Sequence, residues 1–166
     1  MAFEDNDFSE DFMDDEVEDS LKDKYLTFTI AKEGYGIEIR HVLEIIGIQE
    51  ITALPDMPGF VKGVINLRGK VIPIIDMRLR IHLPEQEYND RTCIIVVHFG
   101  ESQFGLIVDA VSEVIDIPVE NIDKPPKSEK AKYISGIAKT GDQVKIIVNI
   151  EKILTEEQLN ELQEAN

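Results

Sequence analysis

A strand-rich pattern occurs twice in this chain. Residues 35–46, YGIEIRHVLEII, align with residues 104–115, FGLIVDAVSEVI, at a constant offset of 69. Further on, residues 63–76 align, apart from their turns, with residues 136–149 at an offset of 73. The second copy therefore has four extra residues between its two blocks. The duplication predicts two similar modules that share a seam and present several outer faces, and it argues against a single catalytic pocket as the organising feature.

The length of the chain limits how large these modules are. At 166 residues it fits one compact domain or two small modules of roughly 60–70 residues each. Small modules bury little of their surface, so two packed together are favoured over two independent ones. Ile and Val are abundant, tryptophan is absent and aromatic residues make up only 7% of the chain, a bias that favours strands.

The net charge of −16 is unevenly distributed. Residues 1–23 hold eleven Asp or Glu and one lysine, which gives −10, and the other 143 residues hold 22 acids and 16 bases, which gives −6. Neither part has the basic surface that phosphate groups require, which argues against nucleic acid and anionic membranes as partners. The segment 1–23 is predicted to be disordered, with folding on binding left open by Phe8 and Phe12, four residues apart.

The cysteine count and the hydropathy pattern indicate the compartment. Cys93 is the only cysteine, so an intramolecular disulfide is impossible, and its apolar setting is typical of a buried strand residue. No apolar run approaches the roughly 18–20 residues needed to cross a bilayer. The acidic N-terminus is unlike a signal or transit peptide. We therefore expect a cytoplasmic protein with no direct membrane insertion.

Strand-forming patterns begin at residue 24. The strands predicted in the first copy are 25–30, 35–39, 60–67 and 70–75. Turns are predicted at Glu33-Gly34 and at Arg68-Gly69, where glycine supplies the backbone freedom. Pro73 cannot donate to a ladder, so its strand is expected to lie at an edge or to bulge there.

The remaining segments define the expected organisation. Residues 42–48 fit a helical turn followed by a strand, residues 76–83 fit irregular turns, and the second copy opens with strands 93–99 and 104–108 around a turn at 100–103. Short strands with short turns favour small closed or nearly closed barrels. The predicted divisions are an acidic tail at 1–23 and a folded region at 24–162, made of a first copy at about 24–84, a linker at about 84–91, a second copy at about 92–154 and a C-terminal helix at about 155–163.

The sequence carries no clear signature of catalysis or metal binding. The three histidines, His41, His82 and His98, lack metal-ligand spacing, and packing or surface roles are favoured for them over a pH switch. GxSxG, P-loop and GxGxxG motifs are absent, and Cys93 has no basic neighbour to activate its thiol. We therefore expect no catalytic residue, no metal and no cofactor. A small enzyme using two carboxylates is the least favoured alternative.

A few polar and matched positions allow two interpretations each. Arg68, at a hairpin tip, reads as a solvated turn residue in preference to an anchor for a carboxylate. Glu44, inside an apolar stretch, fits a surface position and a polar contact equally well. The matched glycines indicate backbone geometry, and core packing is favoured over docking for the matched valines: Gly63, Gly136, Val42 and Val111.

Several of these stretches resemble the CheW-like chemotaxis coupling proteins. The resemblance is carried, in one fixed order, by VLEIIG at 42–47, GVINLRGKVIPIIDMR at 63–78, VDAVSEV at 108–114 and VNIEKIL at 148–154. It covers about Lys24 to Leu162 and leaves out the acidic tail.

The resemblance implies a mainly β fold of two intertwined five-stranded SH3-like β-barrels with short helices, and no enzymatic activity. It implies a cytoplasmic adaptor that couples a CheA-type histidine kinase of a two-component system to the cytoplasmic tips of methyl-accepting chemoreceptors in membrane-associated arrays. The alternative is the regulatory CheW-like region of a split or truncated histidine kinase. The kinase would meet a barrel end, with no kinase-binding residues assigned. By motif, the implied receptor-coupling residues are Val42, Glu44, Gly63, Arg68, Val108 and Val111.

Overall fold

The computed structural model describes residues 20–128, 131–154 and 158. Most of the acidic tail predicted at 1–23, and all of the C-terminal helix predicted at 155–163 except Gln158, lie outside these described residues. Within them the fold is mainly β with short helical turns, as predicted. No helix in this part of the chain has the length and apolar character to cross a membrane.

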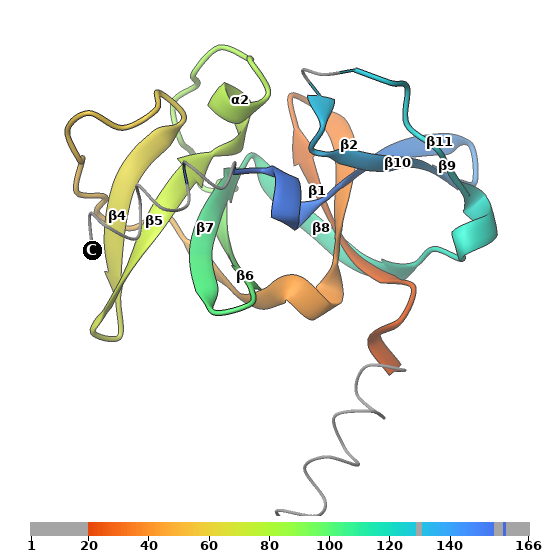
Figure 1. The fold of residues 1–166 in the computed structure, drawn as a ribbon, viewed down its shortest axis with the longest axis horizontal. Helices are drawn as coiled ribbons and strands as arrows, with labels where there is room; N and C mark the ends of the chain where they lie inside the picture. The colour runs from red at the N-terminus through yellow and green to blue at the C-terminus, as the bar shows by residue number, and fades with distance from the viewer. Residues whose placement is uncertain (1–19, 129–130, 155–157, 159–166) are drawn as a thin grey trace, which may run out of the picture.

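The strands form two curved sheets that lie side by side (Figure 1). We call the six-stranded sheet, with the order β8-β1-β2-β11-β10-β9, the first barrel, and the five-stranded sheet, with the order β3-β6-β7-β5-β4, the second barrel. The resemblance implied five strands in each, and the short β9 is the additional one. The strands are β1 Lys24–Ile30, β2 Glu33–Glu38, β3 Val42–Gly47, β4 Val61–Leu67, β5 Lys70–Asp76, β6 Cys93–Phe99, β7 Ser102–Val108, β8 Ala110–Asp116, β9 Ile122–Asp123, β10 Ile134–Thr140 and β11 Gln143–Val148. The helical segments are η1 Ile39–His41, α2 Met77–Arg80, η2 Val119–Asn121 and η4 Ile150–Lys152.

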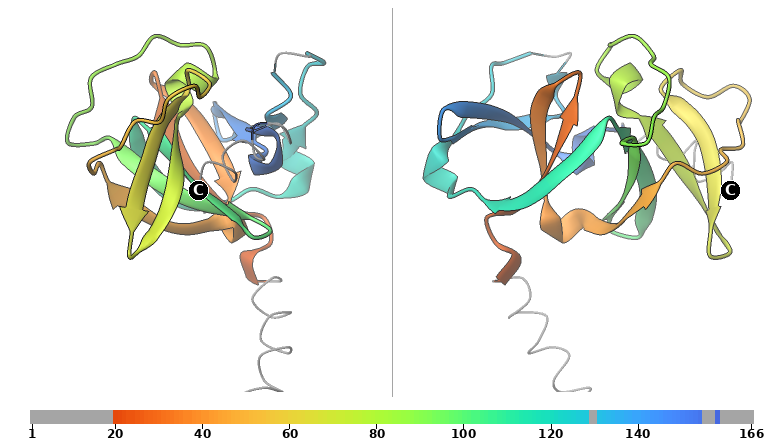
Figure 2. Two further views of the ribbon diagram at one scale, coloured as in Figure 1. Left: turned by 60° about the vertical axis from the view of Figure 1, so that its left-hand side comes forward. Right: turned by 180° about the vertical axis from the view of Figure 1, so that it is seen from behind.

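Each barrel takes strands from both copies of the repeat. Strands β1 and β2 leave the first copy and lie between β8 and β11, with Tyr35 paired in parallel with Ile146. In exchange, β6 and β7 of the second copy lie between β3 and β5. The chain passes between the barrels at η1 and again at Asp109, which can be followed from behind in Figure 2. The two barrels are therefore intertwined, as the resemblance implied.

A shared hydrophobic core holds the barrels together. The largest cluster of buried side chains includes Phe28 and Ile37 of the first barrel together with Ile75 and Leu106 of the second. Smaller clusters fill the interior of each barrel separately. Since burial of apolar surface is the main favourable term in folding, this shared layer makes the two barrels one packed unit.

The two copies match in local detail as well as in sequence. The β4–β5 ladder shifts register between Val61 and Gly63, and the β10–β11 ladder shifts at the equivalent place, between Ile134 and Gly136. At the ends of β5 and β11, side chains at equivalent positions cap the following turn. Asp76 accepts from the Arg78 N–H at 2.9 Å, and Asn149 accepts from the Glu151 N–H at 2.9 Å.

Two hairpin turns test the sequence predictions. The turn at Arg68-Gly69 forms as predicted, with φ of 52° and 85°. The turn predicted at Glu33-Gly34 is wrong, because the chain turns two residues earlier, at Ala31-Lys32, with φ of 52° and 70°. A two-residue hairpin loop of type I′ has both residues in the left-handed region, which matches the strand twist, and at Ala31-Lys32 non-glycine residues supply it.

Two further predictions require correction. The helical turn predicted within residues 42–48 lies just before them, at η1, so the strand already begins at Val42. The strand of Pro73 is not at an edge, since β5 lies between β7 and β4, and the register shift of the β4–β5 ladder lies opposite Ile74 and Ile75, one residue beyond Pro73. Its pairing with β7 covers only Ile74 to Asp76, so Pro73 stands outside that ladder and its missing N–H is tolerated.

Candidate functional site

Glu44 and Arg68 form an ion pair at the surface of the second barrel. Glu44 lies on β3, Arg68 lies at the tip of the β4–β5 hairpin, and barrel curvature brings the two elements together. Both terminal guanidinium nitrogens of Arg68 donate to the two Glu44 carboxylate oxygens, each at 2.7 Å. The Arg68 side chain is 71% exposed and that of Glu44 is 26% exposed. This bidentate geometry fixes the orientation of both groups, while the exposed guanidinium of Arg68 stays accessible to a binding partner.

The pair shifts the titration of both its members. Hydrogen bonds from Arg68 lower the pKa of Glu44; desolvation opposes them, and the positive charge of Arg68 lowers the pKa further. The same hydrogen bonds raise the pKa of Arg68. Both groups therefore stay charged throughout the physiological range.

A groove and exposed apolar side chains surround the pair. We call the groove beside Glu44 the second-barrel groove, and its lining includes Leu43, Glu44, Leu67, Arg68, Lys70 and Ile72. The outward face of β3 exposes Leu43 and Ile45, and Val71 is exposed on β5. Apolar contacts around a charged anchor are the usual composition of a protein-binding surface.

The other four implied receptor-coupling residues are less accessible. Val42 and Val111 are partly buried against the shared core, and Val108 is only 1% exposed within it. Gly63 has φ of +145°, and a Cβ added there would lie 2.0 Å from the Thr52 carbonyl oxygen. The structure thus brings Glu44 and Arg68 together at the surface. The three valines instead pack in or against the shared core, and Gly63 meets a backbone requirement.

The sequence interpretation missed a polar latch at the seam. Arg78 of α2 donates to both carboxylate oxygens of Asp109, at 2.9 and 2.6 Å, and the Ala31 N–H donates to the same carboxylate at 2.8 Å. Burial would raise the pKa of Asp109, but hydrogen bonds from Arg78 and Ala31 outweigh it and lower the pKa. The sequence signal for this contact was Asp109 itself, a lone acid inside the apolar run VDAV.

Arg80 forms a second tie across the seam. Its guanidinium lies 5.4 Å from the ring centroid of Phe60 and 5.1 Å from that of Tyr133. It also donates to the carbonyl of Ile153 at 2.6 Å. Burial lowers the pKa of Arg80, and the flanking aromatic faces compensate part of the lost hydration.

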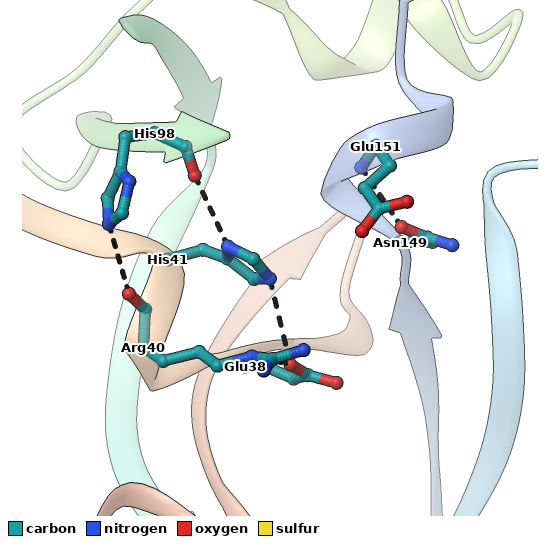
Figure 3. A network of polar contacts seen from close by, with 6 residues as sticks. All are labelled: Glu38, Arg40, His41, His98, Asn149 and Glu151. Carbon is teal, nitrogen blue, oxygen red and sulfur yellow. Dashed lines mark hydrogen bonds and ion pairs between the residues drawn. The ribbon is translucent and has the colours of Figure 1, made fainter. Parts of the chain in front are cut away.

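His41 and His98 support the segment η1, where the chain first passes from one barrel to the other. His41 of η1 lies with its Nδ1 3.2 Å from the His98 carbonyl oxygen, and the Nε2 of His98 lies 3.2 Å from the Arg40 carbonyl oxygen (Figure 3). Glu38 lies 3.6 Å from the Nε2 of His41 and 2.5 Å from the Nε of Arg40. These side chains hold the backbone of η1 and β6 together, which is the packing role favoured for them. The described residues include no group of three or more His, Cys, Asp or Glu arranged to hold a metal ion.

The chain is similar to known proteins over most of its length. Residues 24–158 match the CheW-like domain family. The chain is 36% identical over 144 residues to the chemotaxis protein CheW of Klebsiella aerogenes, covering 85% of this chain and 87% of that protein. It is 33% identical over 144 residues to the chemotaxis protein CheW of Treponema pallidum, covering 82% and 85%. The crystal structure of the scaffolding protein TtCheW from Thermoanaerobacter tengcongensis superposes with a TM-score of 0.76 at 37% identity, covering 82% of this chain and 94% of that one.

Proposed function

The chain belongs to the family of CheW-like domains and is a chemotaxis adaptor, and we propose that it couples a CheA-type histidine kinase to the cytoplasmic tips of methyl-accepting chemoreceptors. In this proposal it is cytoplasmic, is recruited to receptor arrays and makes or breaks no covalent bond. The curated relatives that it matches over most of their length are named as CheW proteins, which favours the adaptor over the regulatory region of a kinase.

The observation that carries the proposal is the exposed Glu44–Arg68 pair on a rigid double barrel. An adaptor must hold two partners at once, so it needs separate faces on one body. We assign receptor coupling to the surface around this pair. Val42, Gly63, Val108 and Val111 would contribute indirectly, through the shared core and the backbone of the double barrel. The kinase would meet a barrel end. Moderate contacts of this kind reach high avidity when many copies assemble in an array.

The test removes the exposed arginine. Arg68→Ala should lower kinase activation, and co-sedimentation with receptor-containing membranes, by at least about fivefold, because arginine is a frequent binding hot spot. Circular dichroism should stay native, since an exposed ion pair contributes at most about 1 kcal/mol to stability. Arg68→Lys should be intermediate because lysine keeps the charge without the planar fork.

The matched control is Arg40→Ala. It removes an exposed arginine of η1 from its ion pair with Glu38, the last residue of β2. That variant should remain within about twofold of the native protein, since Arg40 takes part neither in the Glu44–Arg68 pair nor in the lining of the second-barrel groove. Full coupling in Arg68→Ala would show that this arginine is not the anchor.

A further inference from the structure

The first barrel carries a groove equivalent to the second-barrel groove. We call it the first-barrel groove, and its lining includes Glu113, Thr140, Gly141, Gln143 and Lys145. By the offsets of the repeat, these residues are the counterparts of Glu44, Leu67, Arg68, Lys70 and Ile72. The first-barrel groove therefore keeps the acid of the Glu44–Arg68 pair but has glycine where the arginine stands.

The backbone at the two grooves is also equivalent. The β3–β6 ladder shifts register between Val42 and Glu44, and the β8–β1 ladder shifts at the matching step, between Val111 and Val114. Gly141 has φ of 63° and its counterpart Arg68 has φ of 52°, so both hairpins have the same left-handed first residue. The first-barrel groove thus holds Glu113 in the place that Glu44 has in the other copy.

The backbone of Glu113 is held by hydrogen bonds, whereas its side chain is exposed to solvent. Its carbonyl accepts from the Thr27 hydroxyl at 2.8 Å, and its N–H lies 3.2 Å from the same oxygen. The side chain is exposed, and its carboxylate has no ion-pair or hydrogen-bond partner among the described residues. This contrasts with Glu44, whose two oxygens are both occupied.

The other charged groups of the groove are directed elsewhere. Lys139 pairs with Asp123 at 3.2 Å, and Asp116 pairs with Lys24 at 3.0 Å. The Lys145 ammonium lies against β2, where a Cβ added to Gly34 would be 3.1 Å from its Nζ. Lys145 therefore lines the groove without an ion pair to Glu113.

We propose that the first-barrel groove is a docking site for an arginine side chain presented by a second protein. The incoming guanidinium would bind the Glu113 carboxylate as Arg68 binds Glu44, and the chain itself shows that this fold accepts the two-pronged pair. Ile115, which is partly exposed, also lines the groove and provides apolar contact area. Neither the charge of the groove nor its apolar surroundings favours an acidic partner.

The direct test uses an arginine-bearing hairpin as the probe. A cyclic peptide with the sequence of residues 65–72, INLRGKVI, is titrated into the isotope-labelled full chain and followed by amide chemical shifts. Shifts should concentrate at Thr27, Glu113 and Gly141. The same peptide with Arg68→Ala should bind at least about fivefold more weakly, and Glu113→Gln in the chain should weaken the native peptide similarly. Equal binding of the two peptides, or shifts confined to other surfaces, would overturn the proposal.

A second variant fills the groove from within. Gly141→Arg restores the residue of the other copy, and an added Cβ at this position meets nothing within 4 Å. Its guanidinium should occupy Glu113 and abolish binding of the peptide, whereas Gly141→Ala, which imposes the same backbone demand, should bind it normally. Retained binding in Gly141→Arg would also refute the site. These measurements need no kinase or chemoreceptor, so their outcome is separate from that of the proposed adaptor function.

Discussion

Gly63 shows how a single residue can affect function through the fold. Thr52 and Val64 exchange two backbone hydrogen bonds of 2.9 Å, which press the Thr52 carbonyl against the Gly63 Cα. The position therefore excludes a side chain by contact as well as by its φ of +145°. Loss of coupling in a Gly63 variant would arise from a displaced β4, the strand that leads into the hairpin of Arg68.

Gly63→Ala should lower the free energy of unfolding by at least about 3 kcal/mol, because backbone strain and a steric clash add. Gly69→Ala is the control: it has φ of +85° but open space around an added Cβ, so strain alone should cost about 1–2 kcal/mol. Urea unfolding of both variants measures the difference. Equal losses would mean that contact with Thr52 is not decisive.

At the scale of secondary-structure elements, the Arg78–Asp109 ion pair connects a helix with two chain connections. It joins α2 to the β7–β8 passage, and the Ala31 N–H adds the β1–β2 turn. The Arg78 and Asp109 side chains are only 15% and 31% exposed, so water screens this pair less than a surface pair. The latch therefore fixes the angle at which the chain enters β8.

Asp109→Asn should cost about 1–3 kcal/mol of unfolding free energy at neutral pH, since it weakens a charge-assisted pair that is partly buried. The lowered pKa of Asp109 sets the pH dependence. The ionised carboxylate stabilises the fold fully above the unfolded-state pKa of about 3.9, and this contribution disappears as the pH falls through the lower folded-state value.

Denaturant unfolding between pH 2 and 8 tests this dependence. The difference between the native protein and Asp109→Asn should be constant above about pH 5 and should shrink in acid. Asp116→Asn, which breaks the exposed pair with Lys24, should cost less than about 1 kcal/mol. A difference for Asp109→Asn that does not change with pH would contradict the assignment.

The elements also show what local sequence can predict. Strand β6 forms over the predicted residues, and glycine marked the turn at Arg68-Gly69, because residue preferences act locally there. The turn at Ala31-Lys32 has no glycine and was missed. The Glu44–Arg68 pairing was also beyond local patterns, because it depends on barrel curvature that brings β3 to a hairpin from elsewhere in the chain.

The whole molecule depends on the exchange of strands between the copies. Within one copy, no local pattern shows that β1 pairs with β8 or that β2 pairs with β11. Only the family resemblance implied that the barrels are intertwined. Each barrel contains strands from both copies, and the largest core cluster spans both barrels. One copy of the sequence repeat is therefore not a unit that folds by itself.

Neither copy should therefore fold alone. A fragment of residues 92–166 lacks β1 and β2, which stand between β8 and β11 in the first barrel. It should give the narrow amide spectrum of an unfolded chain, as should residues 20–91, and an equimolar mixture should recover native dispersion. The intact chain should unfold in one transition by every probe. A well-dispersed spectrum from either fragment by itself would disprove this coupling.

The pairing of Tyr35 with Ile146 has a consequence for biosynthesis. The second strand of the protein leaves the ribosome long before its parallel neighbour has been translated. Such distant pairings are slow to form because a long loop must close first. The nascent chain therefore leaves one edge of β2 unpaired until β11 has been translated, and an unpaired strand edge of this kind favours aggregation.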